Sequence, residues 1–424
     1  MKLDSEFIDS MRELLGGELD AFLAALGGQR EYGFRVNTLK TDVGGLINLP
    51  PQTPVPWCAE GFYYDNQASA PLGKNPLYNA GLYYIQEPSA MSAAALLDAK
   101  PMERVLDLCA SPGGKTAQLA AAMQGQGLLV SNDASSGRIP QLLRNIEMAG
   151  IKNAIVLCET PNRLAARLEG YFDKVLVDAP CSGEGMFRKD PAARAAWDPS
   201  KPARLANIQK TILHDAAKMV NSGGFLVYST CTFNKVENED VVGDFLAKNP
   251  DFRLAGEPLR IFPHTHRGEG HFAAKLQKIG EREGKGDCPT HLGTVPGAAE
   301  FHQFRKLYNL TLQGEGIFAH SDRLFLAPPI FPNLSGLRII RAGLFLGTLK
   351  KKRFTPSYAL ALALKKGDFS QSIDLEHNDP KIQKFLGGET FEICAPDGYS
   401  LFCVEAHPIG FAKVLKNRLK GRII

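Results

Sequence analysis

The sequence has few of the features that mark a secreted or membrane-spanning chain. Its eight cysteines include no Cys-x-x-Cys pair, and no apolar run approaches the roughly 18 to 20 residues that cross a bilayer. The first residues, Met1 to Phe7, are amphipathic and include acids, unlike a signal or transit peptide. We therefore expect reduced thiols, a cytoplasmic location and no association with membranes.

The sequence also lacks a strong excess of charge of either sign. It contains 49 lysines and arginines against 45 aspartates and glutamates, which gives a net charge of +4. This balance permits a local basic face but does not by itself indicate nucleic-acid binding. The 44% hydrophobic content is ordinary for a globular protein. A chain of 424 residues is too long to form a single hydrophobic core, so we expect two or three domains.

Two familiar phosphate-binding motifs are absent as well. The run Cys109-Ala110-Ser111-Pro112-Gly113-Gly114-Lys115 contains neither Gly-x-Gly-x-x-Gly nor the spacing of a P-loop. Its two glycines nevertheless allow close backbone approach, and the helix expected after them offers unpaired N–H groups. The next predicted strand ends at Asp133, where a carboxylate is the usual partner of a ribose diol. We interpret the loop as a cofactor site; the alternative is a tight turn that binds nothing.

Strands and helices alternate through the middle of the sequence. The pattern predicts strands at 104–109, 128–133, 154–158, 174–179 and 224–230, and helices at 114–123, 138–149, 203–220 and 236–248. This order is typical of an α/β fold in which helices cover both faces of a parallel sheet. A hairpin over 259–278, turning at 267–270, would add antiparallel strands at one edge.

The flanking regions differ from this middle part in composition. Short helices are predicted within 5–27, a proline-rich connector at 49–56 and a polar linker at 279–299. Beyond the linker, β-like runs at 323–327 and 343–347 and a helix at 356–365 indicate a different domain. We expect an accessory domain over 1–78, an α/β domain over 79–280 and a β-rich domain over 300–424.

Two cysteines follow predicted parallel strands. Cys181 closes the run Asp178-Ala179-Pro180-Cys181, and Cys231 follows Tyr228-Ser229-Thr230. Ligands of a doubly wound sheet bind beyond the carboxyl ends of its strands, so both thiols and the glycine loop should line one crevice. Cys231 also precedes a predicted helix, where a thiolate is favoured. Buried structural positions are expected instead for Cys109, Cys158, Cys394 and Cys403.

Together these motifs resemble the RNA cytosine-C5 methyltransferases of the Nol1/Nop2/Sun family, and among them the bacterial RsmF-like branch that acts on 16S ribosomal RNA. The resemblance is carried by residues 35–40, 84–91, 109–115, 178–183, 229–233 and 237–239. Residues 405–414 resemble, more weakly, the PUA-like RNA-binding tail of that branch. The resemblance implies a class I S-adenosylmethionine-dependent methyltransferase fold with a Rossmann-like mixed sheet, a small N-terminal RNA-binding domain and a PUA-like C-terminal domain.

The resemblance also implies a role for each motif. Cys231 would add to C6 of cytosine, because C5 is a poor nucleophile until addition breaks the conjugation of the ring. Cys181 would assist release of the methylated product, Asp178 would hydrogen-bond the base, and Lys115 would orient groups around Asp178. S-adenosyl-L-methionine would be held by Cys109, Ala110, Ser111, Pro112, Gly113, Gly114, Lys115, Asp133 and Asp178. Pro-Cys and Thr-Cys motifs occurring together favour RNA over DNA as substrate.

The sequence departs from the family after the third strand of the sheet. The family has an acid there that contacts the adenine side of the cofactor, whereas this sequence reads Cys158-Glu159-Thr160-Pro161. Thr160 aligns with that acid by spacing, and Glu159 is a candidate substitute for it.

Three other groups have competing interpretations. His264, His266 and His271 suggest a metal, but surface imidazoles in a hairpin turn are favoured because no second ligand set is visible, so we expect no metal. Arg188 and Lys189 form either a lid that reaches the RNA backbone or an exposed connection. The basic residues of the C-terminal domain form either a solvated face or a phosphate-binding surface: Lys350, Lys351, Lys352, Arg353, Lys413, Lys416, Arg418, Lys420 and Arg422.

We expect the partner to be RNA, with 16S ribosomal RNA or the small ribosomal subunit favoured through the resemblance, and the enzyme to act as a monomer. A transfer-RNA cytosine methyltransferase and a non-catalytic RNA-binding assembly factor are the alternatives. Methyltransferases of base nitrogens tend to carry Asn/Asp-Pro-Pro-Tyr/Phe where this sequence has Asp178-Ala179-Pro180-Cys181.

Overall fold

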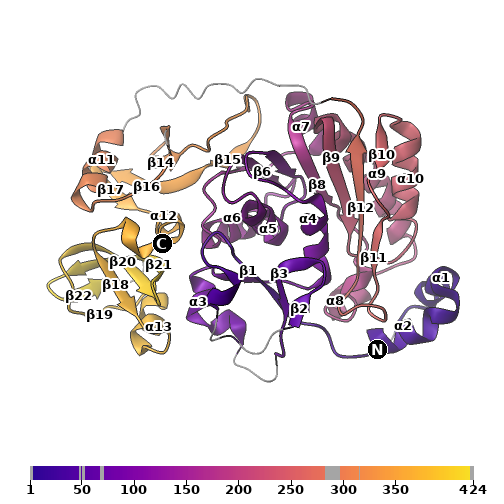
Figure 1. The fold of residues 1–424 in the computed structure, drawn as a ribbon, viewed down its shortest axis with the longest axis horizontal. Helices are drawn as coiled ribbons and strands as arrows, with labels where there is room; N and C mark the ends of the chain where they lie inside the picture. Colours follow the sequence, from indigo (N-terminus) through magenta and orange to yellow (C-terminus); the bar gives the residue numbers. More distant parts are fainter. Residues whose placement is uncertain are drawn as a thin grey trace.

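A nine-stranded mixed sheet forms the centre of the molecule (Figure 1). The computed structural model describes residues 3–46, 49, 53–66, 71–281, 297–314 and 316–420. The sheet order is β10-β12-β9-β8-β5-β6-β7-β15, and β11 pairs with β12. Its strands are β5 (Arg104–Asp107), β6 (Leu128–Asn132), β7 (Ala154–Leu157), β8 (Phe172–Asp178), β9 (Val220–Thr230), β10 (Phe252–Leu254), β11 (Leu259–Ile261), β12 (His271–Lys278) and β15 (Ile339–Ala342). Strands β5 to β9 run parallel and the others antiparallel, as the predicted α/β fold with an edge hairpin requires.

Two apolar cores lie on opposite faces of this sheet, because successive side chains of a strand alternate between faces. Leu106 and Val175 pack in the core beneath α7, α9 and α10, whereas Val105 and Leu176 pack beneath α4, α5 and α6. The helices of this region are α4 (Ser92–Leu97), α5 (Gly114–Ala122), α6 (Ile139–Met148), α7 (Pro161–Arg167), α8 (Pro191–Ala195), α9 (Lys201–Met219) and α10 (Glu239–Lys248). The four predicted helices are confirmed, and α4, α7 and α8 are additional.

The N-terminal region combines two helices with a small antiparallel sheet of order β2-β3-β1-β4. Its elements are α1 (Ser5–Leu15), α2 (Leu19–Leu26), β1 (Gly33–Val36), β2 (Thr53–Val55), β3 (Cys58–Tyr63), α3 (Pro76–Asn79) and β4 (Tyr83–Ile85). The connector predicted at 49–56 is wrong at Thr53–Val55, where a strand begins; Pro54 is tolerated because β2 is an edge strand. The domain boundary at 78 stays a prediction, and β4 beyond it pairs with β1.

The C-terminal region contains two further sheets, of order β13-β14-β16-β17 and β18-β20-β21-β22-β19. Its elements are α11 (Ala298–Leu307), β13 (Ile317–His320), β14 (Arg323–Leu326), β16 (Leu344–Lys350), β17 (Arg353–Pro356), α12 (Tyr358–Ala363), β18 (Ser372–Leu375), α13 (Pro380–Leu386), β19 (Phe391–Glu392), β20 (Gly398–Val404), β21 (His407–Leu415) and β22 (Arg418–Lys420). The predicted runs at 323–327 and 343–347 and the helix at 356–365 are confirmed. Most of the predicted linker, 282–296, lies outside the described residues.

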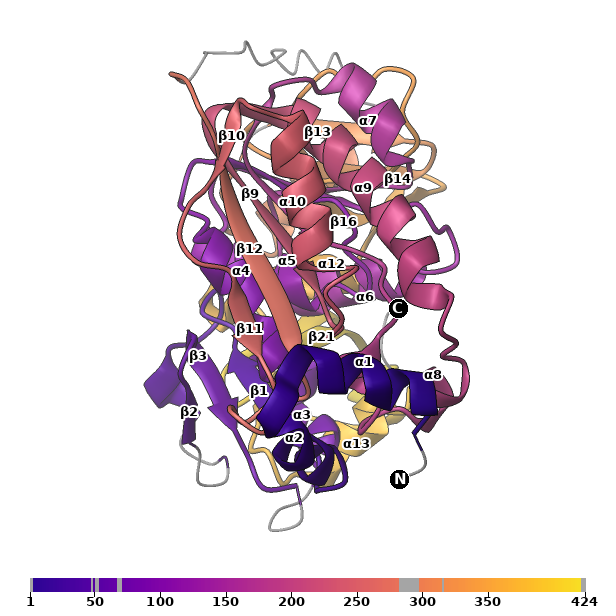
Figure 2. The same cartoon turned by 90° about the vertical axis from the view of Figure 1, so that its right-hand side faces the viewer.

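Segments far apart in the sequence meet in this structure. Strand β15 comes from the C-terminal region yet pairs with β7 of the central sheet. Helices α1 and α2 lie across the lower end of the central region, near α8 (Figure 2). In the described part of the chain, no helix combines the length and the apolar character needed to cross a membrane.

Candidate active site

A cavity of about 220 Å³ lies at the carboxyl ends of β5, β8 and β9. Most of the residues predicted for the site line it: Cys109, Ala110, Ser111, Pro112, Gly114, Lys115, Asp178 and Cys231. Further lining residues come from β4 and the segment after it, from the end of β5, from the loop after Cys181 and from the start of β12: Tyr84, Ile85, Gln86, Glu87, Ala90, Asp107, Met186, Lys189 and His271. The cavity therefore combines the glycine loop with one of the two thiols.

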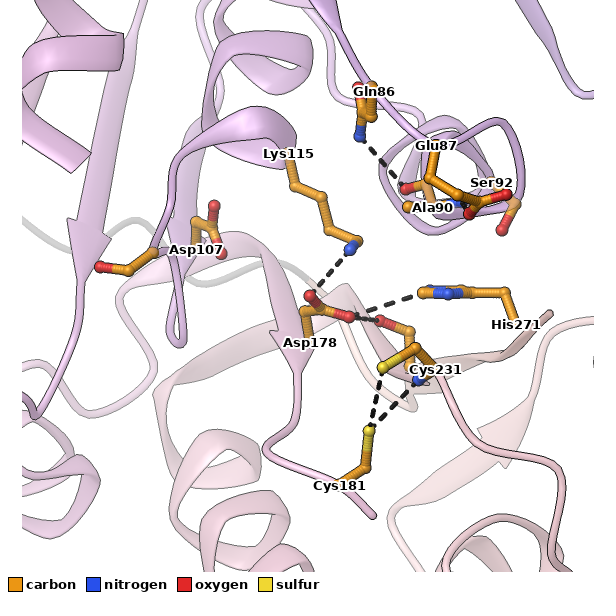
Figure 3. Close-up of polar contacts among 12 residues, drawn as sticks. Gln86, Glu87, Ala90, Ser92, Asp107, Lys115, Asp178, Cys181, Cys231 and His271 are labelled. Atoms are coloured by element: carbon orange, nitrogen blue, oxygen red, sulfur yellow. Dashed lines mark hydrogen bonds and ion pairs between the residues drawn. The ribbon is translucent and has the colours of Figure 1, made fainter. Parts of the chain in front are cut away.

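The two thiols face each other at the edge of this cavity (Figure 3). The Sγ atoms of Cys181 and Cys231 are 3.3 Å apart, and the backbone N–H of Cys231 donates to Cys181 Sγ at 3.4 Å. Cys231 lines the cavity, whereas Cys181 lies behind it. The hydrogen bond to Cys231 and burial raise the pKa of Cys181 well above its usual range. Cys181 is therefore a thiol at neutral pH and can donate its S–H to the sulfur of Cys231.

A partly buried ion pair lies beside the thiols, with the side chains of Lys115 and Asp178 12% and 29% exposed. Lys115 Nζ donates to Asp178 Oδ2 at 2.7 Å, and the hydroxyl of Ser229 donates to Asp178 Oδ1 at 2.9 Å. Burial opposes ionisation of Asp178, but Lys115 and these hydrogen bonds outweigh it and hold its pKa below the usual range. Burial likewise opposes the charge of Lys115, and Asp178 outweighs it, so the pKa of Lys115 is raised. Both groups are thus charged at neutral pH.

Two buried carboxylates tie the loops of the thiols together. Glu184, three residues after Cys181, accepts hydrogen bonds from the backbone N–H groups of Phe233 and Asn234, both at 3.0 Å. Glu237 accepts from the backbone N–H of Ser182 at 2.9 Å and from the Asn234 amide at 2.8 Å. Both glutamates are at most 1% exposed. The spacing of the two sulfurs is therefore fixed by hydrogen bonds that join one loop to the other.

The glycine loop fits the cofactor that the resemblance implies. Gly113 adopts φ +108°, which disfavours any other residue, and a Cβ on Gly114 would lie 2.8 Å from the ring of Tyr84, so the backbone itself borders the cavity. Asp107 is fully buried; Thr116 donates to its Oδ2 at 2.7 Å, and Oδ1 has no hydrogen-bond partner among the described residues. Burial raises the pKa of Asp107 to about 7. A bare backbone and an unpaired acceptor are what a polar cofactor would contact.

Asp133 lies next to the glycine loop but does not line the cavity. It accepts from the backbone N–H of Ser111 at 3.2 Å and pairs with Arg138 at 3.1 Å. Its contact with a ribose stays a prediction.

The two residues considered for the missing family acid have other partners. Glu159 accepts from the backbone N–H of Arg338 at 2.7 Å and pairs with Arg163 at 3.4 Å. The hydroxyl of Thr160 donates to Asn162 at 2.6 Å. Neither lines the cavity, and Glu159 links β7 to the segment before β15, so a role of either residue in place of the family acid stays a prediction.

The predictions for Arg188 and Cys394 are wrong. Arg188 is no lid residue: its side chain is 8% exposed, and it binds Glu269 at 2.8 Å and the Ala25 carbonyl at 3.1 Å. Of these two residues, Lys189 is the one that is exposed and lines the cavity. Cys394 is exposed, whereas Cys158 and Cys403 are buried as predicted.

Two of the three histidines predicted to lie on the surface of the hairpin turn are largely buried. His266 is exposed, but the side chain of His264 is 6% exposed and His271 is 3% exposed. His271 reaches the cavity because β12 runs antiparallel to β9, with Phe272 opposite Thr230. The described residues contain no cluster of three histidines, cysteines or acids that could hold a metal.

Sequence reasoning missed Asp107, Glu87, Lys189 and His271 as residues of the cavity. Asp107 directly precedes the glycine loop, and Glu87 lies within the motif 84–91, so both had a local signal. His271 had none, since only the pairing register of β12 brings it to Cys231.

Comparisons with known proteins agree over nearly the whole chain. Family models match in four consecutive parts: the N-terminal domain of 16S rRNA methyltransferase RsmF at 3–88, 16S rRNA methyltransferase RsmB/F at 94–277, the RsmF rRNA methyltransferase first C-terminal domain at 303–364, and the methyltransferase RsmF PUA domain at 372–423. Ribosomal RNA small subunit methyltransferase F of Cronobacter sakazakii is 33% identical over 99% of this chain and 95% of its own length. The protein of that name from Escherichia coli is 33% identical over 98% and 94%.

Solved structures share the fold of about two thirds of this chain. A methyltransferase homologue from Pyrococcus horikoshii superposes with a TM-score of 0.55 at 29% identity, over 65% of this chain and all of that one. NSun6 from the same organism superposes with a TM-score of 0.59 at 22% identity, over 66% of this chain and 99% of that one.

Proposed function

Because the chain belongs to the RsmF family of S-adenosylmethionine-dependent ribosomal RNA small subunit methyltransferases, we propose that it methylates C5 of a cytosine in 16S ribosomal RNA. The reaction would proceed through a transient bond between Cys231 and C6 of the base. One observation supports this proposal: Cys231 lines the same cavity as the Lys115–Asp178 ion pair, and the Sγ atom of Cys181 lies 3.3 Å from the Sγ atom of Cys231. We assign the methyltransferase chemistry to 79–280 and RNA contacts to 1–78 and 300–424.

Addition at C6 is the step that activates the base. The thiolate of Cys231 forms the S–C6 bond, and the C5–C6 electron pair becomes available at C5 with charge spread over the ring. Asp178, an anion, accepts a hydrogen bond from the exocyclic amine of cytosine and orients the ring. Lys115 keeps Asp178 ionised and in place. When bound along the glycine loop and Asp133, S-adenosylmethionine supplies the electrophilic methyl group.

Release of the product uses the second thiol. C5 loses its proton to solvent water, and the electron pair of the C5–H bond re-forms the C5–C6 double bond. Cys231 leaves C6 with the electrons of the S–C6 bond. Cys181 stays protonated because its pKa is raised, so it can donate its S–H to the departing thiolate. We propose that this hydrogen bond makes Cys231 a better leaving group.

The target must leave its stack to enter a cavity of this size. Backbone and shape contacts from the N-terminal and PUA-type domains would supply the remaining affinity. We propose that one copy of the chain suffices, since all the groups named for the reaction come from one chain, and that it works in the cytoplasm, where ribosomes are assembled.

Substitution of each thiol tests the proposed roles. Cys231→Ala should abolish methyl transfer to 16S ribosomal RNA, whereas Cys181→Ala should accumulate protein covalently attached to RNA, visible as a slower band in denaturing electrophoresis. The double variant should form no adduct, and Cys394→Ala, at an exposed cysteine in the C-terminal domain, should behave as wild type.

Bisulfite sequencing of RNA from cells with and without the gene would locate the methylated cytosine. Methylation only in transfer RNA would redirect the assignment to that substrate. Normal methylation by both single variants would refute the covalent mechanism, and an absence of any methyl transfer would favour the non-catalytic alternative.

A further inference from the structure

His271 is a buried polar side chain that makes no hydrogen bond to any described residue. It is 3% exposed, and neither Nδ1 nor Nε2 has a hydrogen-bond partner among the described residues. Leaving a buried polar group without a hydrogen bond costs free energy, so such groups are rare unless a ligand supplies the missing partner. The imidazole lines the catalytic cavity, so a ligand in that cavity is the available partner.

The backbone around His271 is fixed. Phe272 pairs with Thr230 of β9, which places the imidazole next to Cys231. The preceding residue, Gly270, adopts φ +132°, and a Cβ there would lie 2.3 Å from the ring of Phe233. The backbone N–H of Glu269 donates to Glu87 at 2.9 Å. The backbone that carries the imidazole is therefore held in place beside the cavity.

The surroundings of His271 decide its protonation state. Nε2 lies 3.8 Å from Asp178 Oδ1, beyond hydrogen-bond distance, and Asp178 is already bound by Lys115 and Ser229 (Figure 3). Burial and the charge of Lys115 outweigh the attraction of Asp178 and lower the pKa of His271 to about 3. The side chain is neutral at physiological pH and offers one N–H donor and one acceptor.

Resting on the function proposed above, we propose that Asp178 and His271 read adjacent atoms on the Watson–Crick edge of the flipped cytosine. Asp178 accepts from the N4 amine, and His271 donates its N–H to N3. Uracil presents the reverse pattern, with an acceptor at O4 and a donor at N3, so the pair would repel O4 and reject it. A site whose buried polar groups match one base discriminates strongly against a base that leaves them unpaired.

The same hydrogen bond assists the chemistry. When the Cys231 thiolate adds to C6, the electron pair it displaces is shared with N3. A neutral imidazole that donates to N3 stabilises this charge without giving up a proton. His271 thus contributes both to selection of cytosine and to the addition step.

The test compares His271→Phe and His271→Asn with wild type on an RNA fragment that carries the target cytosine. Phenylalanine keeps the shape but removes both nitrogens, and we expect kcat/KM to fall roughly 10- to 100-fold. Asparagine keeps an N–H donor and should recover part of this loss. His266→Phe, in the same hairpin but exposed, is the matched control and should not change kcat/KM.

Two readouts separate this role from a structural one. The melting temperature of His271→Phe should equal or exceed that of wild type, because the substitution removes two unsatisfied buried nitrogens. In a Cys181→Ala background, the ratio of covalent adduct formed with cytidine to that formed with uridine at the target position should fall when His271 is replaced. The dissociation constant for S-adenosylmethionine should not change.

An active wild-type enzyme with an equally active and equally selective His271→Phe variant would overturn this inference alone. Loss of S-adenosylmethionine affinity in step with activity would overturn it too, by assigning His271 to the cofactor. A wild-type enzyme that does not modify cytosine would refute the proposed function and this inference together.

Discussion

Individual side chains of the catalytic cavity are charged or neutral according to whether a partner offsets the cost of burial. Asp178 has Lys115 at 2.7 Å, and its pKa is lowered. Asp107, at the end of the neighbouring strand, has only the Thr116 hydroxyl as a hydrogen-bond partner among the side chains that the structure describes, and burial raises its pKa to about 7. Two aspartates at adjacent strand ends therefore differ in charge below neutral pH.

Asp107 should make the stability of the protein depend on pH. Its folded pKa of about 7 lies above the unfolded value near 4, so between these values the folded state binds more protons and its stability falls as pH rises. Asp107→Asn removes this titration. Between about pH 4 and 7 the free energy of unfolding of the variant should therefore rise relative to that of wild type, by up to about 1.4 kcal/mol per pH unit. Chemical denaturation at pH 4.5, 5.5, 6.5 and 7.5 would measure the difference.

The control for this prediction is Asp9→Asn, at an exposed acid on α1. Its difference from wild type should be the same at each pH. If the difference in free energy of unfolding between Asp107→Asn and wild type is also independent of pH, Asp107 does not titrate as its burial requires.

A residue of the cavity could be predicted from the sequence only where a short motif around it indicated its role. Cys231, Cys181, Asp178 and Lys115 stand in short motifs directly after strands, and the structure brings all four together. His271 has no such signal, because it reaches the cavity through the pairing of two strands distant in sequence.

At the scale of elements, the N-terminal helices support the loops that carry the two thiols. The ring of Phe22 on α2 meets the ring of Phe233 edge-on, with centroids 5.0 Å apart, and Phe233 is two residues from Cys231. Phe7 on α1 lies 5.1 Å from Phe187 in the loop after Cys181. These aromatic residues form one apolar cluster, so α1 and α2 act as a brace for both loops.

Phe22→Ala should weaken this brace. Phe22 is fully buried, and truncation of a buried phenylalanine typically costs 3 to 5 kcal/mol. We expect kcat/KM for RNA methylation to fall several-fold, because Phe233 no longer fixes Cys231, while S-adenosylmethionine binding stays unchanged. Methylation kinetics and calorimetric titration of the cofactor would measure the two effects. Glu13→Ala, at an exposed position of α1, is the control, and equal losses in both measurements would contradict a local role.

The elements of the central sheet could be predicted because their apolar strands and helices follow regular periods. The N-terminal sheet could not, since β1 is four residues long and contains the buried Arg35. Its guanidinium donates to the Gln86 side chain at 3.3 Å and to the Gly114 carbonyl at 3.2 Å. A charged residue at a core position breaks the apolar pattern by which a buried strand is predicted. The hydrogen-bond partners that allow Arg35 to be buried come together only in the folded structure.

At the scale of the whole molecule, the terminal regions are joined to each other and to the catalytic sheet. Phe34 of the N-terminal sheet packs in one apolar core with Phe402 of the last domain. Strand β15 extends the central sheet beyond β7, and the Arg338 that precedes it donates to Glu159. None of these contacts leaves a local pattern in the sequence, so the sequence could not predict that residues of the first and last regions pack in one apolar core.

The ion pair between Arg341 on β15 and Glu147 on α6 tests whether the C-terminal region stabilises the catalytic sheet. The distance is 3.0 Å, and the side chain of Arg341 is 4% exposed against 27% for Glu147. Glu147→Gln leaves a buried guanidinium without its counter-charge and should cost roughly 3 to 5 kcal/mol. Arg341→Met leaves only a half-exposed carboxylate and keeps the apolar stem, so its cost should be clearly smaller.

Adding Arg341→Met to Glu147→Gln should therefore restore part of the lost stability, since it removes the unpaired charge. Denaturant unfolding of the full chain, followed by S-adenosylmethionine titration of each variant, would measure this coupling. If β15 stabilises the sheet next to the cofactor loop, cofactor affinity should fall and recover together with stability. Additive losses in the double variant would instead mean that the strand is attached to the sheet without supporting it.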